Sequence, residues 1–251
     1  MSTLSIRGFL AVAMAIAIAS VANAQMAHRL KGSLKTNQGA ALANGAIQAD
    51  NLSGFRGEPF AGTKQHVTHS TDKGEWNITG IEAGLWLFST TAPGTVPAAV
   101  VIPVKFSQRQ QVSAVGNSLT WQLPIYAYPA DEHPMLKYAL EHLAAGRKTE
   151  AFEALTVALG PEIGAETRVA AGELALLVQQ PILARTLFDM VLKAQPQHGR
   201  AKLGAAGAAL MNRDWEIAGK IIWEARDLAP KDQRQALAAA IDDLRAIARV
   251  Q

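Results

Sequence analysis

The two halves of the chain differ in the spacing of their apolar residues. Between residues 28 and 128, short segments alternate apolar and polar residues, as in strands that bury one face. From residue 130 to the end, apolar residues recur every three or four positions, as in helices that bury one side. The pattern predicts a β domain followed by an α domain. The boundary falls at residues 126–134, where two prolines and two acidic residues end the first pattern.

Turn signals divide the first half into about seven candidate strands. Examples are Asn37-Gln38-Gly39, Asp72-Lys73-Gly74 and Pro93-Gly94. Short strands with this punctuation predict a seven-stranded antiparallel β-sandwich. The predicted strands are Arg29–Lys35, Ala46–Asn51, Lys64–Ser70, Glu75–Thr79, Leu85–Thr91, Val96–Phe106 and Gln111–Leu123. The expected core residues are Trp76, Ile78, Ile81, Leu85 and Leu87, and residues 51–62 are expected to form a polar, exposed loop.

One motif in this half runs from Thr71 to Leu87. It reads TDKGEWNI and then GIEAGLWL, with APG following at residues 92–94. Together with GSLKTNQG at residues 32–39, it resembles the carboxypeptidase regulatory-like domain, which has a transthyretin-like sandwich. The resemblance covers most of residues 30–95 and departs at Thr95, where that family usually has an aromatic residue. It implies a folding, spacing or binding module without catalytic activity.

The second half repeats itself with a period of 33–34 residues. Ala184 and Ala218 are 34 residues apart, as are Pro196 and Pro230, and Ala151 lies 33 before Ala184. A helix–turn–helix unit of this length resembles the tetratricopeptide repeat. Its small positions fall at Ala139, Gly172 and Ala206 in the first helix and at Ala151, Ala184 and Ala218 in the second. Its later large position falls at Leu155, Phe188 and Ile222, and its closing proline at or near Pro161, Pro196 and Pro230.

The last stretch, Asp232 to Val250, is predicted to be a capping helix. Its apolar residues fall on one face, and charged residues occupy the others, as terminal repeats require for solubility. The apolar face consists of Leu237, Ile241, Leu244 and Ile247.

The N-terminus has the features of a secretory signal peptide. Arg7 supplies a positive charge, residues 9–19 are apolar, and Ala22-Asn23-Ala24 is a small-residue cleavage signal. The apolar run is shorter than the roughly 20 residues that span a bilayer, although an uncleaved membrane anchor is the alternative. We expect a mature protein from Gln25, in the periplasm of a Gram-negative bacterium or secreted. The domains are then a signal peptide (1–24), a sandwich (25–129) and helical repeats with a capping helix (130–251).

Composition narrows the possible chemistry. The chain has no cysteine, so disulfides, thiol nucleophiles and thiolate metal ligands are excluded. Its formal net charge of +3 is small, and no segment is basic enough to predict nucleic-acid binding. Apolar residues make up 49% of the chain, enough for a substantial core.

No group of residues suggests catalysis. His66 and His69 are three apart on a predicted strand and would point to opposite faces, which argues against a shared metal. Ser70-Thr71-Asp72-Lys73 fits an S-x-x-K pattern, but the hairpin turn explains these residues better. Phosphate-loop and dinucleotide-binding motifs are absent from the sequence. We therefore expect no catalytic residues, no metal site and no cofactor. An enzyme would need a polar cleft with coupled titratable groups.

The candidate site is the concave face that the repeats would form. An apolar strip with a few charges could bind an extended or helical segment of a partner protein. The alternative is that this strip packs on the capping helix or on the sandwich. The candidate groove residues are Leu136, Leu140, Leu143, Val169, Glu173, Leu176, Arg200, Leu203, Gly207 and Leu210.

The sequence thus favours a non-catalytic interaction or scaffold protein that binds a partner protein through this groove. A second hypothesis is binding of cell-wall or other polysaccharide by the sandwich. It would use Trp86 or Trp121 and the loop around Phe55 and Phe60, provided that these aromatic rings are exposed in one plane.

Overall fold

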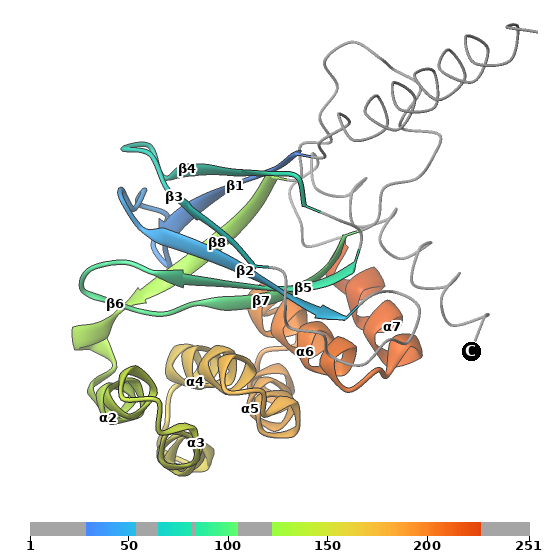
Figure 1. Cartoon of the computed structure of the whole chain (residues 1–251). Helices are drawn as coiled ribbons and strands as arrows, with labels where there is room; N and C mark the ends of the chain where they lie inside the picture. The colour runs from blue at the N-terminus through green and yellow to red at the C-terminus, as the bar shows by residue number, and fades with distance from the viewer. Residues whose placement is uncertain (1–28, 54–64, 82–83, 105–121, 227–251) are drawn as a thin grey trace, which may run out of the picture.

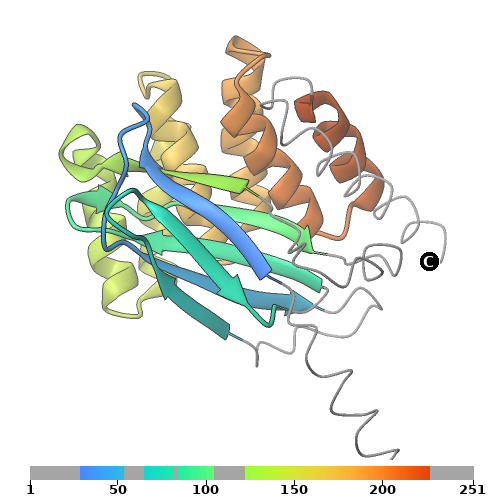
Figure 2. The same ribbon diagram turned by 90° about the horizontal axis from the view of Figure 1, so that it is seen from above.

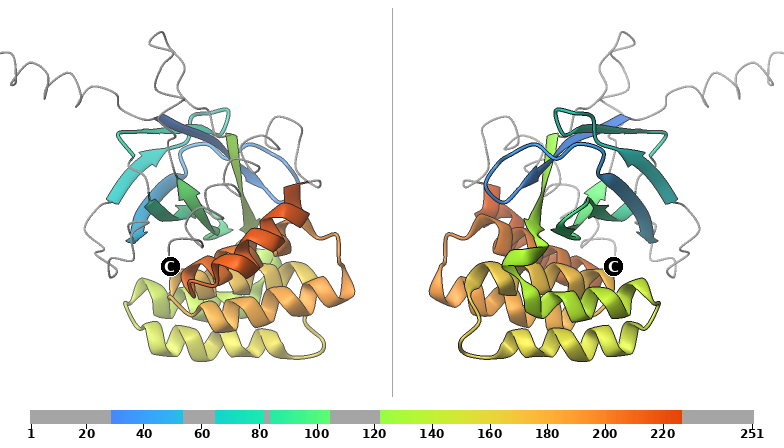
Figure 3. Two further views of the ribbon diagram at one scale, coloured as in Figure 1. Left: turned by 90° about the vertical axis from the view of Figure 1, so that its right-hand side faces the viewer. Right: turned by 90° about the vertical axis from the view of Figure 1, so that its left-hand side faces the viewer.

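In the computed structural model, residues 29–53, 65–81, 84–104 and 122–226 are described (Figure 1). These residues form three layers, in which two β-sheets stack on each other and a layer of helices covers the outer face of the second sheet (Figures 1 and 3). The predicted signal peptide, most of the predicted loop at 51–62 and the predicted capping helix lie outside the described residues.

Eight strands form the two sheets in the described part of the chain. One sheet has the order β4-β1-β8-β6 and the other β3-β2-β5-β7. All neighbouring strands are antiparallel except β1 and β8, which run parallel. The strands are β1 Arg29–Thr36, β2 Ala46–Ser53, β3 Gln65–His69, β4 Glu75–Thr79, β5 Gly84–Thr91, β6 Thr95–Val96, β7 Ala99–Val104 and β8 Gln122–Pro129.

The sandwich differs from the predicted seven-stranded antiparallel one, because the described residues form eight strands and β1 and β8 are parallel. Two strand bounds differ as well. The predicted strand Val96–Phe106 is divided between β6 and β7, which belong to different sheets. Most of the predicted strand Gln111–Leu123 lies outside the described residues, and the last described strand, β8, runs from Gln122 to Pro129. The two boundary prolines, Pro129 and Pro134, were expected to end the sheet and introduce a helix. Strand β8 ends at Pro129 and α2 begins at Pro134.

The aromatic core between the two sheets matches the prediction. Trp76, Ile78 and Ile81 are buried there together with Trp86 and Phe88. Leu85 and Leu87 are also buried, but they belong to the second core, which sheet and helices share. Because side chains alternate along a strand, β5 contributes Trp86 and Phe88 to one core and these leucines to the other.

The turn at Asp72-Lys73-Gly74 connects β3 to β4, but these strands belong to different sheets, so the prediction of a hairpin was wrong. Gly74 has a φ of +73°, which favours glycine, and a Cβ atom there would lie 2.5 Å from the Leu34 carbonyl oxygen. The Leu34 N–H donates to the Gly74 carbonyl at 2.7 Å. This turn therefore fixes β1 against the β3–β4 connection.

The second half forms three consecutive helical hairpins, arranged side by side in chain order (Figure 2). All nine predicted small and large repeat positions are buried, which confirms the predicted repeat register. The helices are α2 Pro134–Ala144, α3 Lys148–Thr156, α4 Ala165–Leu177, α5 Pro181–Ala194, α6 Gly199–Met211 and α7 Trp215–Arg226, with short 3-10 helices η2 at Ala130–Glu132 and η3 at Val157–Leu159.

The turn inside each hairpin has the same geometry. Gly146, Gln179 and Arg213 occupy equivalent positions and have φ values of 73°, 59° and 62°. In each turn, the N–H of the following residue donates a hydrogen bond to the carbonyl oxygen of the residue five positions before it. The three N···O distances are 2.8, 2.8 and 2.9 Å. This is the Schellman arrangement, in which glycine is usual at the left-handed position. Only the first hairpin has glycine there, so the other two turns are strained.

We predict that Gln179→Gly and Arg213→Gly each raise the free energy of unfolding by about 0.5–1 kcal/mol. A left-handed residue with a side chain costs about 1–2 kcal/mol, and the greater freedom of glycine in the unfolded chain offsets part of the gain. Urea denaturation measures the change. Gln180→Gly is the control, because φ is −110° there and no gain is expected. Equal gains at positions 179 and 180 would contradict the role of the left-handed turn.

Phe188 of α5 fixes the spacing between neighbouring hairpins. Its ring lies against Gly172 of α4 and Gly204 of α6, where added Cβ atoms would stand 2.8 and 2.3 Å from it. Such distances are below ordinary contact, so both positions need glycine while the ring is present. A large residue on one helix thus matches glycines on two neighbours.

We predict that Gly204→Ala destabilises the protein by about 1–3 kcal/mol, because overpacking displaces Phe188. Adding Phe188→Leu should recover part of this loss. Gly219→Ala on α7 is the control: nothing lies within 4 Å of its added Cβ, and alanine should stabilise the helix by up to about 1 kcal/mol. Thermal and urea denaturation of the variants would test the prediction. If Gly204→Ala left the free energy of unfolding unchanged, the Phe188 ring would be able to move aside at no cost, which would contradict the prediction.

Candidate functional site

The predicted groove lies where the helices meet the sandwich. Leu87, Ala99 and Val101 of the second sheet share one apolar core with residues of α4 and α6. Strand β7 is the outermost strand of its sheet, and it packs on both of these helices (Figure 1). The concave side of the second and third hairpins therefore holds a strand of the same chain.

The edge of β7 is accommodated by two residues of the groove. The Ala99 N–H donates to Glu173 Oε2 at 3.1 Å, so the carboxylate takes the place of a neighbouring strand. An added Cβ at Gly207 of α6 would lie 3.2 Å from Val101 Cβ, which is tighter than usual contact. Glycine at this position therefore lets the helix backbone approach the strand closely. Both residues were predicted to line the groove, and both serve its contact with β7.

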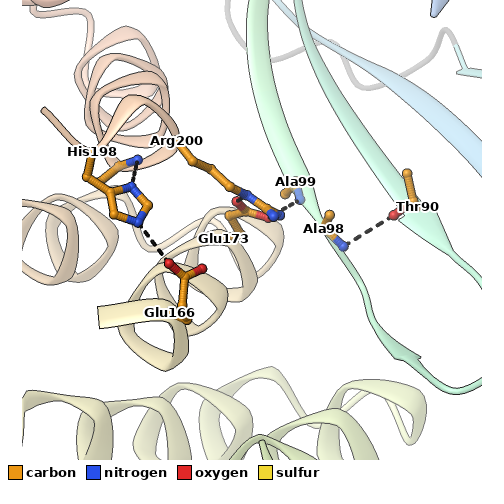
Figure 4. Close-up of polar contacts among 8 residues, drawn as sticks. Thr90, Ala98, Ala99, Glu166, Glu173, His198 and Arg200 are labelled. Carbon is orange, nitrogen blue, oxygen red and sulfur yellow. Dashed lines mark hydrogen bonds and ion pairs between the residues drawn. The ribbon is translucent and has the colours of Figure 1, made fainter. Parts of the chain in front are cut away.

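Glu173 is paired with Arg200 across the second and third hairpins (Figure 4). Arg200 Nε donates to Glu173 Oε1 at 2.5 Å and Arg200 Nη2 donates to Oε2 at 2.7 Å, a two-pronged ion pair. The Glu173 and Arg200 side chains are 4% and 17% exposed. The guanidinium carbon lies 4.1 Å from the centre of the Tyr128 ring, at the end of β8. We call Glu173, Arg200, Tyr128 and Ala99 the seam cluster.

Burial acts on the pKa of all three titratable side chains of the seam cluster. It raises the pKa of Glu173 above its ordinary value, although Arg200 and the Ala99 N–H act in the opposite direction. Burial alone would lower the pKa of Arg200, but the Glu173 carboxylate more than offsets this and holds that pKa above its ordinary value. Burial also raises the pKa of Tyr128, so the phenol stays neutral. Glu173 therefore depends on Arg200 to remain ionised at this place.

A second set of polar contacts surrounds the seam cluster. His198 caps the start of α6 by accepting from the Ala201 N–H at 3.2 Å, and its other ring nitrogen lies 3.1 Å from Glu166 Oε1 (Figure 4). His133 Nδ1 lies 2.8 Å from Thr167 Oγ1. These contacts link the ends of helices and the chain between β8 and α2. We interpret these contacts as hydrogen bonds that stabilise the fold.

The ten predicted groove residues divide into two sets. Leu136, Val169, Glu173, Leu176, Gly207 and Leu210 are buried. Leu140, Leu143, Arg200 and Leu203 are half-buried. The alternative in which the strip packs on the sandwich thus describes the second and third hairpins. The sequence did not single out Tyr128, because nothing local indicates that its ring will lie under an arginine 72 residues later.

The other candidate residues have structural roles. His66 and His69 lie at half-buried and exposed positions of β3 and do not converge. Ser70 is buried, accepts from the Gly45 N–H at 2.9 Å and donates to the Leu42 carbonyl at 2.7 Å, so it joins main-chain segments. Among the described residues, no group of three or more His, Cys, Asp or Glu could hold a metal ion. Likewise, no helix in this part is long and apolar enough to cross a membrane.

The aromatic residues proposed for polysaccharide binding are not presented on a surface. Trp86 is fully buried and Trp76 almost so. Trp121, Phe55 and Phe60 lie outside the described residues. A stacking platform needs exposed ring faces, so the described part of the sandwich gives this hypothesis no support.

Comparisons with known proteins show low similarity. No protein-family model matches the sequence, and no curated protein matches it. Among solved structures, the first TPR of Spaghetti (RPAP3), bound to an HSP90 peptide, is 14% identical; the match covers 47% of this chain and 90% of that one, with a TM-score of 0.36. MamA from Desulfovibrio magneticus RS-1 is 19% identical over 47% of this chain and 76% of its own, with a TM-score of 0.34.

Other solved structures that match the chain are of another kind. A catechol 1,2-dioxygenase of Acinetobacter radioresistens is 6% identical, with a TM-score of 0.27. The match covers 41% of this chain and only 52% of the dioxygenase, about half of its length. At these TM-scores, neither kind of match carries an argument about activity.

We predict that the seam cluster contributes strongly to stability. Glu173→Ala or Arg200→Ala leaves a largely buried charge without its partner, which typically costs about 3–5 kcal/mol. The double variant should lose clearly less than the sum of the two, as measured by urea denaturation in a double-mutant cycle. The control is the more exposed pair Arg185–Asp189, at 2.8 Å, whose loss should cost at most about 0.5 kcal/mol. Additive losses at Glu173 and Arg200 would contradict the coupling.

Proposed function

We propose that this chain is a non-catalytic interaction or scaffold protein that binds a partner protein at the first helical hairpin. The observation that carries the proposal is the unequal burial of equivalent groove positions. Leu140, Glu173 and Gly207 share one repeat position, and Leu143, Leu176 and Leu210 share another. In the second and third hairpins these residues are buried, whereas Leu140 and Leu143 are half-buried.

The contacts of β7 account for this difference. The strand packs on α4 and α6, whereas α2 packs on its own hairpin partner α3 and contacts the short elements β6 and η2. The apolar strip therefore continues past the part that the sandwich fills. A partner that covered Leu140 and Leu143 would gain about 1.5–3 kcal/mol for each side chain taken from full exposure to full burial, and less from their half-buried state.

The lack of catalytic function is part of the proposal. The seam cluster is the main group of buried titratable side chains in the described structure, and its members hold β7 and the helices together. Such groups are committed to the fold, unlike the coupled acid and base of an enzyme that must exchange protons with a substrate.

We infer further that the two halves are a carboxypeptidase regulatory-like sandwich and tetratricopeptide-like repeats. Support for the first comes from the motif at residues 71–87: Gly74 makes the tight turn, and Trp76, Ile78 and Ile81 fill the core. Support for the second comes from the buried small and large repeat positions. Export to the periplasm, after cleavage near Ala24, is proposed from the N-terminal sequence.

We predict that Leu140→Glu combined with Leu143→Glu removes partner binding without unfolding the protein. Charged groups at these two positions would have to be desolvated in a complex, so at least a tenfold loss of affinity, about 1.4 kcal/mol, is expected. The full-length chain, expressed with its own signal sequence, would be crosslinked in periplasmic extract. The captured protein would then be identified and its affinity for the purified variant measured.

The matched control is Val157→Glu, which adds a charge at an apolar residue that is 60% exposed outside the groove. It should leave binding unchanged. If the partner binds the Leu140/Leu143 variant as tightly as the parent protein, the first hairpin is not the site. If no partner is captured by the parent protein, the proposed function itself fails.

A further inference from the structure

The two edge strands of the sheet β3-β2-β5-β7 differ in how their main-chain groups are covered. At the β7 edge, the Ala99 N–H points away from β5 and donates to Glu173. Main-chain direction alternates along a strand, so Val101 and Pro103 also face away from β5. Val101 lies against Gly207, and Pro103 has no N–H to donate. The β7 edge is therefore closed to another strand.

The β3 edge is open in the described part of the chain. Ser70, directly after β3, faces β2, because its N–H donates to the Gly45 carbonyl at 2.9 Å. By the same alternation, the main-chain N–H and C=O groups of Gln65, Val67 and His69 point away from β2. Among the described residues, no group forms a hydrogen bond with these main-chain groups. Three residues of β3 thus present unpaired donors and acceptors.

The sequence of β3 lacks the features that usually keep an edge strand from pairing with another chain. Such strands carry proline, lysine or another charged residue, or they contain a bulge. Strand β3 reads QHVTH, without proline, Asp, Glu, Lys or Arg, and its register with β2 is regular along its whole length. Val67, at its centre, is 56% exposed. This edge is therefore suited to strand addition.

We propose that β3 pairs with β3 of a second copy of this chain, antiparallel and about a two-fold axis at Val67. In this register the two Val67 residues face each other, and Gln65 of each copy faces His69 of the other. Every outward N–H of one strand then meets an outward carbonyl of the other. The two four-stranded sheets would become one continuous antiparallel sheet.

The side chains of β3 favour a second copy as the occupant. Gln65 Nε2 donates to Asp50 Oδ1 at 2.9 Å, which leaves the Gln65 amide oxygen as an acceptor. The ring of His69 in the second copy would lie opposite this oxygen and can donate to it. The two exposed valines would bury apolar surface on each other, and no like charges would face each other. The edge is thus complementary to itself.

The contact is short, so the dimer would be weak. A standard protein interface buries about 1,600 Å², and a strand of this length provides less. We expect a dissociation constant on the order of 0.1 mM. The pairing is independent of the proposed function. If the first hairpin does bind a partner, a dimer would hold two such sites, and a partner with two binding segments would bind more tightly to it.

Cysteine cross-linking tests the pairing directly. Because the chain has no cysteine, Val67→Cys gives a protein with one thiol. Facing residues in this kind of antiparallel pair have Cα atoms about 5.5 Å apart, which a disulfide can span. Mild oxidation of the full-length protein should form a covalent dimer about tenfold faster than in the control, Val157→Cys. Val157 is 60% exposed, similar to Val67, but lies on η3.

Two double variants that share one change test the register. Gln65→Lys with His69→Glu sets opposite charges against each other at both ends of the pair, whereas Gln65→Lys with His69→Lys sets like charges there. Both keep a donor for Asp50 at position 65. In sedimentation equilibrium, the first variant should dimerise about tenfold more tightly than the second. Urea denaturation of both checks that the fold is retained.

Three outcomes would overturn the proposal. Val67→Cys could cross-link no faster than Val157→Cys, or the two charge variants could associate equally. The parent protein could also remain a monomer up to about 1 mM, ten times the expected dissociation constant. A monomer whose Val67 amide nevertheless exchanges slowly would mean that another part of the same chain covers the edge. Selective cross-linking at Val67, with tighter association of the opposite-charge variant, is the expected result.

Discussion

The edge of strand β7 is the constraint on which the arrangement of sheet and helices depends. A strand at the edge of a sheet needs partners for the main-chain donors that it turns away from that sheet. Here the partner of the Ala99 N–H is the carboxylate of Glu173. A carboxylate can stay ionised at this depth because Arg200 contacts both of its oxygens, and Arg200 in turn lies on the ring of Tyr128. The packing of β7, of helices α4 and α6 and of the end of β8 therefore depends on one set of contacts.

The same repeat position serves three purposes in the three hairpins. Leu140 is an apolar residue at the uncovered end of the groove, Glu173 accepts a hydrogen bond from a strand, and Gly207 lets a strand approach. A repeat array usually presents its concave side to a partner as one continuous surface. In this protein, β7 packs on that surface at the second and third hairpins, where most of the groove residues belong to the core shared with the sandwich.

The local features of the fold could be predicted from the sequence. The repeat period fixed which alanines, glycines and large residues would be buried, and the turn at Gly74 was evident from its spacing. What could not be predicted depends on contacts between distant residues. The parallel pairing of β1 with β8 leaves no local pattern, and the bond from Ala99 to Glu173 spans 74 residues. Glu173 and Arg200 therefore resembled groove charges, although they pair with each other under the sandwich.

Because β7 fills part of the groove, the kind of partner that the helices could bind is different from that of an empty groove. An empty groove over three hairpins can hold a long extended peptide, whereas β7 occupies the groove here at α4 and α6 and leaves Leu140 and Leu143 of α2 half-buried. That part adjoins β6 and η2, so a partner seated on Leu140 and Leu143 would touch elements of both halves of the chain. Because the seam cluster fixes these halves relative to each other, such a composite surface would be rigid before the partner arrives. A preformed surface loses less conformational entropy on binding, which favours affinity even where the contact area is small.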